Sequence, residues 1–457
     1  LADAFLQEAV MKTRLYNLWE SIQSSLWFVP GLMSFSAICF AFFLLFIDDS
    51  FTLPSSSIGK YLYNAGPEGA RSLLSTIAGS VITVAGVTFS ITVVALTLAS
   101  SQFGPRLLRN FMKDKANQMV IGTFVSTFIY CLLVLRSVEM YHQASFVPSL
   151  SVTMAVVLMV VNAAVLVFFI HHISSSIQAD SVITNVYREL VADIERLFTD
   201  DENSSQKRSF NHAEVDGYAH ELRLKNKKDG YIQALNTKKL MEIAFSNDLL
   251  LQIPFRAGQY AMDNDTLVMV RSREKIGKEI VDPIDECFLI GSVRTPEQDP
   301  EYAIHQLVEV ALRALSPSIN DPFTAATCID RLGSAISLLT TKSFPPKYEF
   351  DADNTLRLIT NPSNFKGMVD TAFNQIRQYG ATSVAVTIRL LEVIEGIAVH
   401  ATGKEHRDAL HRQARMIKRV SRETIPEKYD REDVDKRYER VLKALNITEY
   451  APVDKEG

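Results

Sequence analysis

The chain has 457 residues, which leaves room for two or three domains of about 150 residues each. Its 47 basic and 52 acidic side chains give a formal net charge of −5, and this acidic balance argues against nucleic acid as a partner. The four cysteines include no C-x-x-C pair and have no histidine at zinc-ligand spacing, so we expect neither a disulfide framework nor a metal site.

The charges are distributed unevenly along the chain. Residues 1–175 contain seventeen charged side chains, whereas the remaining 282 residues contain eighty-two. Charged groups are costly in hydrocarbon and are needed on a surface in water. The pattern therefore predicts a membrane part followed by a soluble part.

Four segments in the first part are apolar and about as long as the roughly 20 residues that a bilayer core requires. They are Leu26–Ile47, Ser72–Ser100, Met119–Leu135 and Val147–Ile170. Among the short loops, the one at 101–118 carries the excess of basic residues. The positive-inside rule then predicts a multi-pass protein with this loop, both termini and the soluble part in the cytoplasm. No acidic residue or lysine lies inside a predicted span, which argues against a coupled carrier.

The second predicted span carries a polar stripe. Alternate steps of four and three residues give eight positions, of which six are hydroxyls: Thr76, Ser80, Thr83, Val87, Ser90, Val94, Thr97 and Ser101. This spacing puts them on one face of a helix. One interpretation is a packing seam between helices, and the other is the wall of a water-filled pore built by several copies of this helix. A seam between subunits partly satisfies both.

The span is expected to end at Gly104-Pro105, because glycine followed by proline breaks a helix. Beyond it, apolar residues alternate with Arg106 and Arg109, which predicts a short amphipathic helix at the lipid interface. One interpretation is that this elbow docks on lipid headgroups and sets the topology. The other is that it forms a gate at the inner mouth of a pore, with Gly104, Pro105, Arg106 and Arg109 as the residues of that mouth.

The chain is predicted to begin with an N-terminal segment at 1–20 and a transmembrane domain at 21–175. Three soluble regions are expected to follow. Residues 176–213 are expected to form a helical stalk that continues the fourth span into water, followed by a polar linker. Residues 214–275 alternate at period two in places and predict a small β-rich module. Residues 276–457 are expected to form a helical domain, with helices at about 365–379, 381–400, 405–423 and 431–444. The fold class is thus a four-helix membrane domain plus a cytoplasmic α+β domain.

Three motifs in order along the chain, Ser90–Arg106, Arg294–Pro300 and Ala314–Ala325, resemble those of a family of bacterial integral membrane proteins known as domain of unknown function 2254. The resemblance implies four spans and a cytoplasmic domain in the inner membrane, and it supplies no established activity. In Asp299-Pro300 and Asp321-Pro322, aspartate suits the N-cap of a helix and proline its first position. Arg294 and Arg313 are candidate partners for these acids.

The sequence contains no G-x-S-x-G, H-E-x-x-H, Walker or G-x-G-x-x-G motif, so we expect neither an enzyme nor a cofactor. The basic segment at 404–422 is expected to be a solvated helix face or a contact for acidic lipids. The leading hypothesis is a homo-oligomeric inner-membrane channel lined by the second span, with a slight preference for anions because of Arg106 and Arg109. The alternative is a membrane-anchored sensor or scaffold that acts through its cytoplasmic domain.

Overall fold

The structure, a computed structural model, describes residues 27–50, 66–107, 111–112, 114–140, 147–200, 215 and 217–447. The chain divides into two units, Leu1–Ser181 and Val182–Gly457. The described part of the first unit contains four helices that are long and apolar enough to cross a membrane: α2 (Phe28–Ser50), α3 (Pro67–Phe103), α5 (Lys115–Met140) and α6 (Ser149–Ser176). The predicted spans are confirmed as candidate membrane helices.

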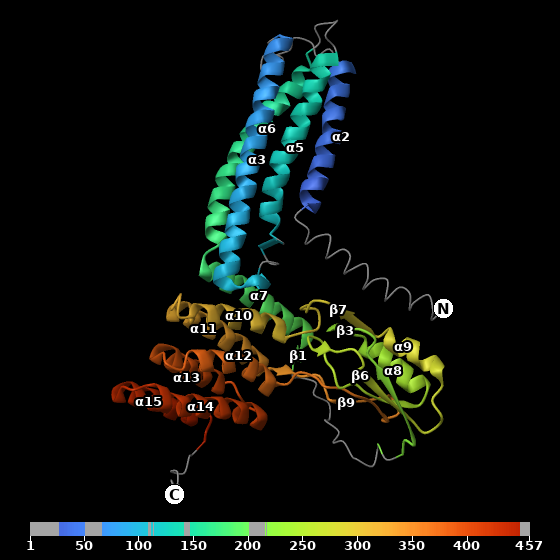
Figure 1. The fold of residues 1–457 in the computed structure, drawn as a ribbon, viewed down its shortest axis with the longest axis vertical. Helices are drawn as coiled ribbons and strands as arrows, with labels where there is room; N and C mark the ends of the chain where they lie inside the picture. The colour runs from blue at the N-terminus through green and yellow to red at the C-terminus, as the bar shows by residue number, and fades with distance from the viewer. Residues whose placement is uncertain are drawn as a thin grey trace. The chain divides into compact units, whose positions relative to one another are not determined.

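The four helices of the first unit run side by side, and α5 contacts each of the other three (Figure 1). Close approach depends on small residues, as is usual where lipid gives no hydrophobic drive for helix association. A Cβ atom at Gly122 of α5 would lie 2.5 Å from Met33 Sδ and 3.2 Å from Pro30 Cα of α2. The α2–α5 contact therefore leaves little room for a side chain at this position.

Helix α3 is longer than predicted, with 37 residues that extend about 55 Å at 1.5 Å per residue. It begins at Pro67, whose ring suits the first helical position, and ends at Phe103. Gly104 then has φ +113°, a conformation that favours glycine, and the 3-10 helix η1 (Pro105–Leu107) follows. The predicted break is confirmed. Arg109 and the side chain of Arg106 lie outside the described part of the chain.

The segment after the fourth span does not stand in water as a stalk. Helix α6 ends at Ser176, and α7 (Ala179–Leu197) starts after a short turn. Its apolar face is buried in the second unit, with Ile183, Leu190 and Ile194 at most 1% exposed. The periodicity correctly predicts a helix, and the same apolar stripe packs this helix into the second unit.

Two sheets form the β part of the second unit. The larger has the strand order β2-β6-β4-β10-β9, and only β4 and β10 among its neighbours are parallel. Its strands are β2 (His220–Lys225), β6 (Thr266–Ser272), β4 (Leu249–Gln252), β10 (Leu356–Ile359) and β9 (Tyr348–Phe350). The smaller has the order β5-β3-β7, with β5 (Tyr260–Ala261), β3 (Gly230–Leu235) and β7 (Phe288–Gly291). Helix α8 (Thr237–Ser246) shares a core with β4 and β6 through Leu240, Leu251 and Val270.

Residues 276–457, which were predicted to form a helical domain, also contain strands, so the prediction of an all-helical region is wrong. Strands β7, β8 (Lys342–Ser343), β9 and β10 all lie in this region, and β8 pairs with β1 (Thr199–Asp200). Strand β10 has four residues, all buried, so it lacks the alternation that marks a half-exposed strand. Three strands before residue 276, β1, β3 and β4, therefore pair with strands beyond it.

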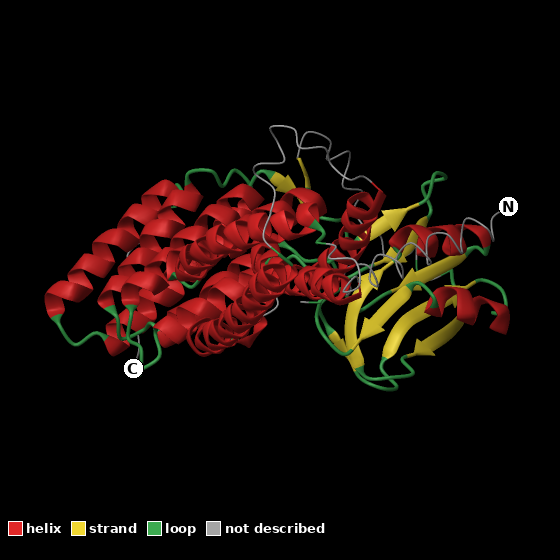
Figure 2. Cartoon of the chain, turned by 90° about the horizontal axis from the view of Figure 1, so that it is seen from above, coloured by secondary structure: helices red, strands yellow, loops and turns green. Residues whose placement is uncertain are grey.

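Helices η4 (Lys278–Ile280) and α9 (Val281–Asp285) pack with the β part, where Ile284 joins the same core. The helical part of the second unit, which Figure 2 shows largely apart from the strands, consists of α10 (Glu301–Ala314), α11 (Pro322–Leu339), α12 (Phe365–Tyr379), α13 (Val384–Ala398), α14 (Lys404–Thr424) and α15 (Lys428–Ala444). Helices α11 and α13 pack together, as do α12 and α14. The four helices predicted after residue 360 lie within a few residues of α12 to α15.

Candidate functional site

The polar stripe of α3 faces away from the rest of the chain. All eight stripe positions are exposed: Thr76, Ser80, Thr83, Val87, Ser90, Val94, Thr97 and Ser101. The buried residues of α3 form a separate set that includes Leu74, Ile77 and Ala85. At about 100° per residue, the two sets lie on opposite sides of the helix. The chain therefore uses one side of α3 for its own packing and leaves the stripe uncovered.

Five of the six hydroxyls of the stripe donate to carbonyls of their own helix. Thr76 Oγ1 donates to Ser72 O at 2.7 Å, and Thr83 Oγ1 donates to Gly79 O at 2.7 Å. Ser90, Thr97 and Ser101 make equivalent bonds of 2.9 Å to Gly86, Val93 and Leu98. These five donors are thus satisfied locally, while their oxygen lone pairs remain available to water or to another helix.

Two glycines beside the stripe have no packing role within the chain. A Cβ atom built at Gly79 or Gly86 would meet nothing within 4 Å. Both residues are exposed and lie one heptad apart. Glycine in a membrane helix lowers helix propensity and is favoured where another backbone approaches closely. The open space at both positions can accommodate such a helix.

The elbow after α3 is held by apolar side chains and backbone bonds. Phe103 and Leu107 are 6% and 2% exposed. Gly104 N donates to Ser100 O at 3.1 Å, and Leu107 N donates to Gly104 O at 3.3 Å. Gly104 and Pro105 thus form the predicted turn, while a role in gating remains a prediction.

An ion-pair geometry near the elbow was not predicted from the sequence. Asp114 Oδ1 accepts from Ala116 N at 2.9 Å at the start of α5, while its Oδ2 lies 2.6 Å from His172 Nε2 of α6. The His172 ring stacks on Phe168, with centroids 5.5 Å apart. The sequence could have indicated this pair, because it has an aspartate just before one span and a histidine at the end of the next. Antiparallel neighbouring helices bring such positions together.

Polar groups deeper in the bundle bond across helices. Asn162 Nδ2 donates to Thr127 Oγ1 at 2.8 Å and to Leu158 O at 2.6 Å. Asp48 of α2 accepts from Leu150 N at 3.1 Å and from Ser151 N at 2.9 Å, which satisfies two donors at the start of α6. These contacts connect α2, α5 and α6 and lie apart from the stripe on α3.

The motif around Asp299 is a tightly packed ion pair. Arg294 Nη2 donates to Asp299 Oδ1 at 2.9 Å, and Arg294 Nε also donates to the same carboxylate. Asp299 is 2% exposed and accepts from Glu301 N at 3.1 Å. Helix α10 starts at Glu301 with Pro300 at the N-cap, so Asp299 bonds to the helix start from one residue before the N-cap, where it was predicted to be the N-cap itself. A Cβ atom at Gly258, where φ is +86°, would lie 2.3 Å from Asp299 Oδ2. The candidate partnership of Arg294 with Asp299 is confirmed.

Asp321 caps α11 as predicted. Its Oδ1 accepts from Phe323 N and Thr324 N, both at 3.1 Å, and its Oδ2 accepts from Thr324 Oγ1 at 2.6 Å. The bond from the Thr324 hydroxyl, followed by the backbone bonds, lowers the pKa of this carboxyl. Arg313, the predicted partner, instead lies 3.6 Å from Glu309 one turn before it. The aspartates of both motifs therefore have structural roles.

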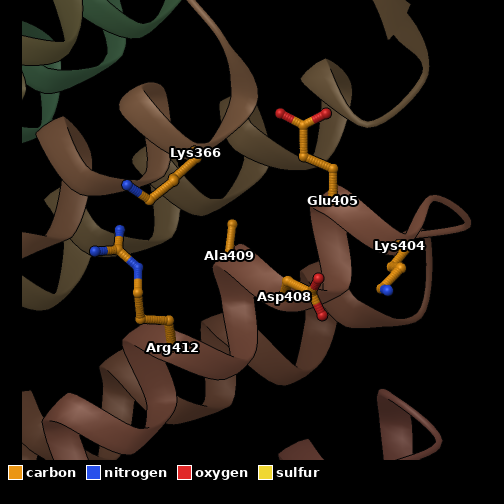
Figure 3. Close-up of a pocket in the computed structure, with 6 residues that line it drawn as sticks. All are labelled: Lys366, Lys404, Glu405, Asp408, Ala409 and Arg412. Atoms are coloured by element: carbon orange, nitrogen blue, oxygen red, sulfur yellow. The ribbon is translucent and has the colours of Figure 1, made fainter.

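A shallow hollow of about 440 Å³ lies between α12 and α14 (Figure 3). It is lined by three basic residues, two acidic residues and one alanine: Lys366, Lys404, Arg412, Glu405, Asp408 and Ala409. Arg412 also donates to Asp370, which accepts from Gln413 Nε2 at 2.6 Å as well. Elsewhere on α14, Lys418 and Arg422 lie 3.6 and 3.7 Å from Asp435. Much of the basic charge of α14 is thus balanced within the chain.

The two thiols of the second unit, Cys287 and Cys328, are buried and poorly suited to nucleophilic chemistry. Burial raises the pKa of the Cys287 thiol to about 11, and it also raises the pKa of Cys328. Within the described ranges, no group of three or more His, Cys, Asp or Glu side chains could hold a metal ion.

Four candidate spans followed by a soluble region of small sheets and helices define an integral membrane protein. The chain belongs to the family of predicted membrane proteins called DUF2254, whose model matches residues 23–396. It is 28% identical over 379 residues to uncharacterized proteins of Mycobacterium tuberculosis and Mycobacterium bovis, which covers 82% of this chain and 72% of each relative. No solved structure matches the chain. The resemblance that the three sequence motifs carried is confirmed.

Proposed function

We propose that the chain forms a homo-oligomeric membrane channel whose pore is lined by α3. The observation that carries the proposal is the position of the stripe, which is exposed along the helix and opposite the buried face. In a single chain this stripe would face lipid. Assembly of several copies around an axis would turn it toward water, and Gly79 and Gly86 would allow neighbouring helices to approach.

Two features of the proposed pore have opposite effects on ion selectivity. The locally bonded hydroxyls present oxygen lone pairs, which favour cations. A ring of Arg106 and Arg109 at the inner mouth would favour anions through its positive potential. We retain a slight anion preference as a prediction, because full charges outweigh hydroxyl dipoles in a narrow mouth. Its test is a shift of the reversal potential toward cations in Arg106→Glu under a salt gradient.

The assembly is tested first, by mass photometry in mild detergent. A discrete homo-oligomer is expected, and a monomer over a wide concentration range would refute the channel. Single-channel recording then compares Ser90→Leu with Ser75→Leu, which makes the same change at an exposed serine off the stripe. We expect Ser90→Leu to lower the conductance by dewetting the pore, and Ser75→Leu to leave it unchanged. Equal effects of the two variants would leave the stripe without a pore role.

We also propose that the soluble unit is cytoplasmic, on the basis of the basic residues at 101–118 in the sequence. In intact cells, a cysteine at Ser145 is expected to react with an impermeant thiol reagent, and a cysteine at Ser363 is expected to be protected. The reverse labelling pattern would invert the topology.

The second candidate is a membrane-anchored sensor or scaffold that acts through its soluble domain. The observation that favours it is the local bonding of the stripe, because hydroxyls that donate to their own helix tolerate lipid at small cost. Under this hypothesis the hollow between α12 and α14 is the first place to look for a small polar ligand. An oligomer without conductance would favour this candidate.

A further inference from the structure

The loop between α10 and α11 is held rigidly by its own polar groups. Asp321 N donates to Ala314 O at 2.8 Å, and Asn320 N donates to Ser316 O at 2.9 Å. Asn320 has φ +49°, a conformation that asparagine tolerates better than most residues. Together with the Asp321 cap, these bonds account for the polar residues of the motif at 314–325.

Two neighbouring apolar residues, Ile319 in this loop and Phe323 in the first turn of α11, have no such explanation. Phe323 is 83% exposed and Ile319 is 45% exposed. From residue 314 to residue 329 the only charged side chain is Asp321, and its carboxylate is engaged in the cap. The loop therefore presents a rigid, nearly uncharged tip with a large aromatic ring in water, although one charge in every three or four residues is typical of this half of the chain.

The direction of α7 shows which end of the second unit carries this tip. The Arg331 guanidinium lies 5.1 Å from the Tyr187 ring, and the Phe198 and Phe344 rings are 4.8 Å apart. The contact that lies later along α7 also lies later in the segment that contains α11, so α7 and α11 run in the same direction. Ala179 lies eight residues before Tyr187 on α7, and Phe323 lies eight residues before Arg331 on α11, which is about 12 Å along each helix. The tip is thus at the end of the unit where α7 begins.

This end is tied to the membrane by the chain itself. Helix α6, a candidate membrane span, ends at Ser176, and α7 begins at Ala179. The start of α7 is therefore within a few residues of the lipid surface. Aromatic and large aliphatic side chains are favoured in that interfacial region.

We propose that the loop at 315–323 is a membrane-docking surface, in which Phe323 and Ile319 insert into the interfacial region of the bilayer. The short connection from α6 brings this end of the unit to lipid, and the absence of uncompensated charge lets the tip enter it. Docking would give the second unit a second attachment to the membrane besides the chain itself. The surface acts whether or not the protein conducts ions.

The test uses the full chain in nanodiscs and the fluorescence of one added tryptophan. Trp19 and Trp27, the two native tryptophans, are first replaced by phenylalanine. Phe323→Trp is then compared with Tyr429→Trp, a control position that is 74% exposed on α15. In lipids brominated on the upper acyl chain, Phe323→Trp is expected to lose most of its fluorescence and Tyr429→Trp to keep it. Ile319→Trp is expected to behave as Phe323→Trp does.

Equal, weak quenching at all three positions would overturn the proposal. A blue-shifted but unquenched signal from Phe323→Trp would also overturn it, and would indicate a second copy of the chain as the covering surface if the shift vanished at one copy per nanodisc. Because Phe323 is exposed, the substitution is not expected to disturb folding, and an unchanged unfolding midpoint checks this.

Discussion

The two units use polar side chains in different ways. In the membrane unit, the hydroxyls on the described helices bond mostly to carbonyls three or four residues back, as Thr83 and Thr153 do. In the second unit, polar side chains connect elements that are distant in sequence. Arg389 of α13 donates to Asp330 of α11, and Arg357 of β10 donates to Asp248 beside β4.

The difference follows from the solvent and has a structural consequence. A hydroxyl in lipid must find an acceptor nearby, and its own helix always offers one. Such bonds satisfy the donor but do not specify which helix lies next to which. The few long-range polar contacts of the described membrane helices, at Asp48, Tyr130, Asn162 and His172, are therefore expected to carry most of the polar specificity of this unit. The stripe is left free for contacts beyond the chain.

The largest expected effect is the loss of a buried partner in the second unit. Arg294→Ala leaves the Asp299 carboxylate, 2% exposed, without its bidentate partner. We expect a destabilisation of about 3–5 kcal/mol, because an uncompensated buried charge remains. Chemical unfolding of the purified protein, followed by circular dichroism, measures it. Arg422→Ala, at a residue with a 61% exposed side chain, is the control and should cost less than about 1 kcal/mol. A similar cost for both variants would contradict the comparison.

A smaller effect is expected at the long-range contact between α2 and α6. Asp48→Ala removes the acceptor for Leu150 N and Ser151 N, and we expect a loss of about 0.5–2 kcal/mol, as for an N-cap. Unfolding in mixed micelles by titration with a denaturing detergent measures it. Thr153→Ala, which removes a hydroxyl that donates to Ser149 O in its own helix, is the control and should cost less. If the control costs as much, local and long-range bonds are equivalent in this unit.

The cap of α11 gives an effect of about 1 kcal/mol that depends on pH. Asp321→Ala removes a carboxylate that accepts two backbone N–H groups. Because the pKa of Asp321 is lowered in the folded state, its stabilisation is present above the unfolded pKa, near 3.9, and is lost as pH falls through the folded value. The difference in stability between wild type and variant should therefore shrink in acid. A difference that stays constant down to pH 2 would refute the capping role of the charge.

The smallest effect is expected on the stripe. Ser90→Ala removes a hydroxyl that bonds only to Gly86 O in its own helix, so the unfolding free energy of the chain should change by less than about 0.5 kcal/mol. The same micelle titration as for Asp48→Ala measures it. A loss above about 1 kcal/mol would show that the stripe supports the fold of the chain, and the distinction between local and long-range bonds would fail.

Hydropathy and helix punctuation identify most of the fold from sequence. Four spans follow from composition, and Asp321-Pro322 marks the start of α11 as expected. The parallel pairing of β4 and β10 could not be predicted, since over 100 residues separate the strands and β10 contains the buried Arg357 within an apolar run. For the stripe, periodicity gives the residues on one face, but only the packing of α5 against the other face shows that this one is left uncovered.

Gly258 lies where a side chain would occupy the space of the Asp299 carboxylate. The residue at position 299 therefore limits which substitutions position 258 can accept during evolution. While the acid at 299 is retained, position 258 is closed to any residue with a Cβ atom. A chain that first exchanged the acid and its arginine partner for smaller neutral residues would relieve this clash, and only the cost of the positive φ would then favour glycine.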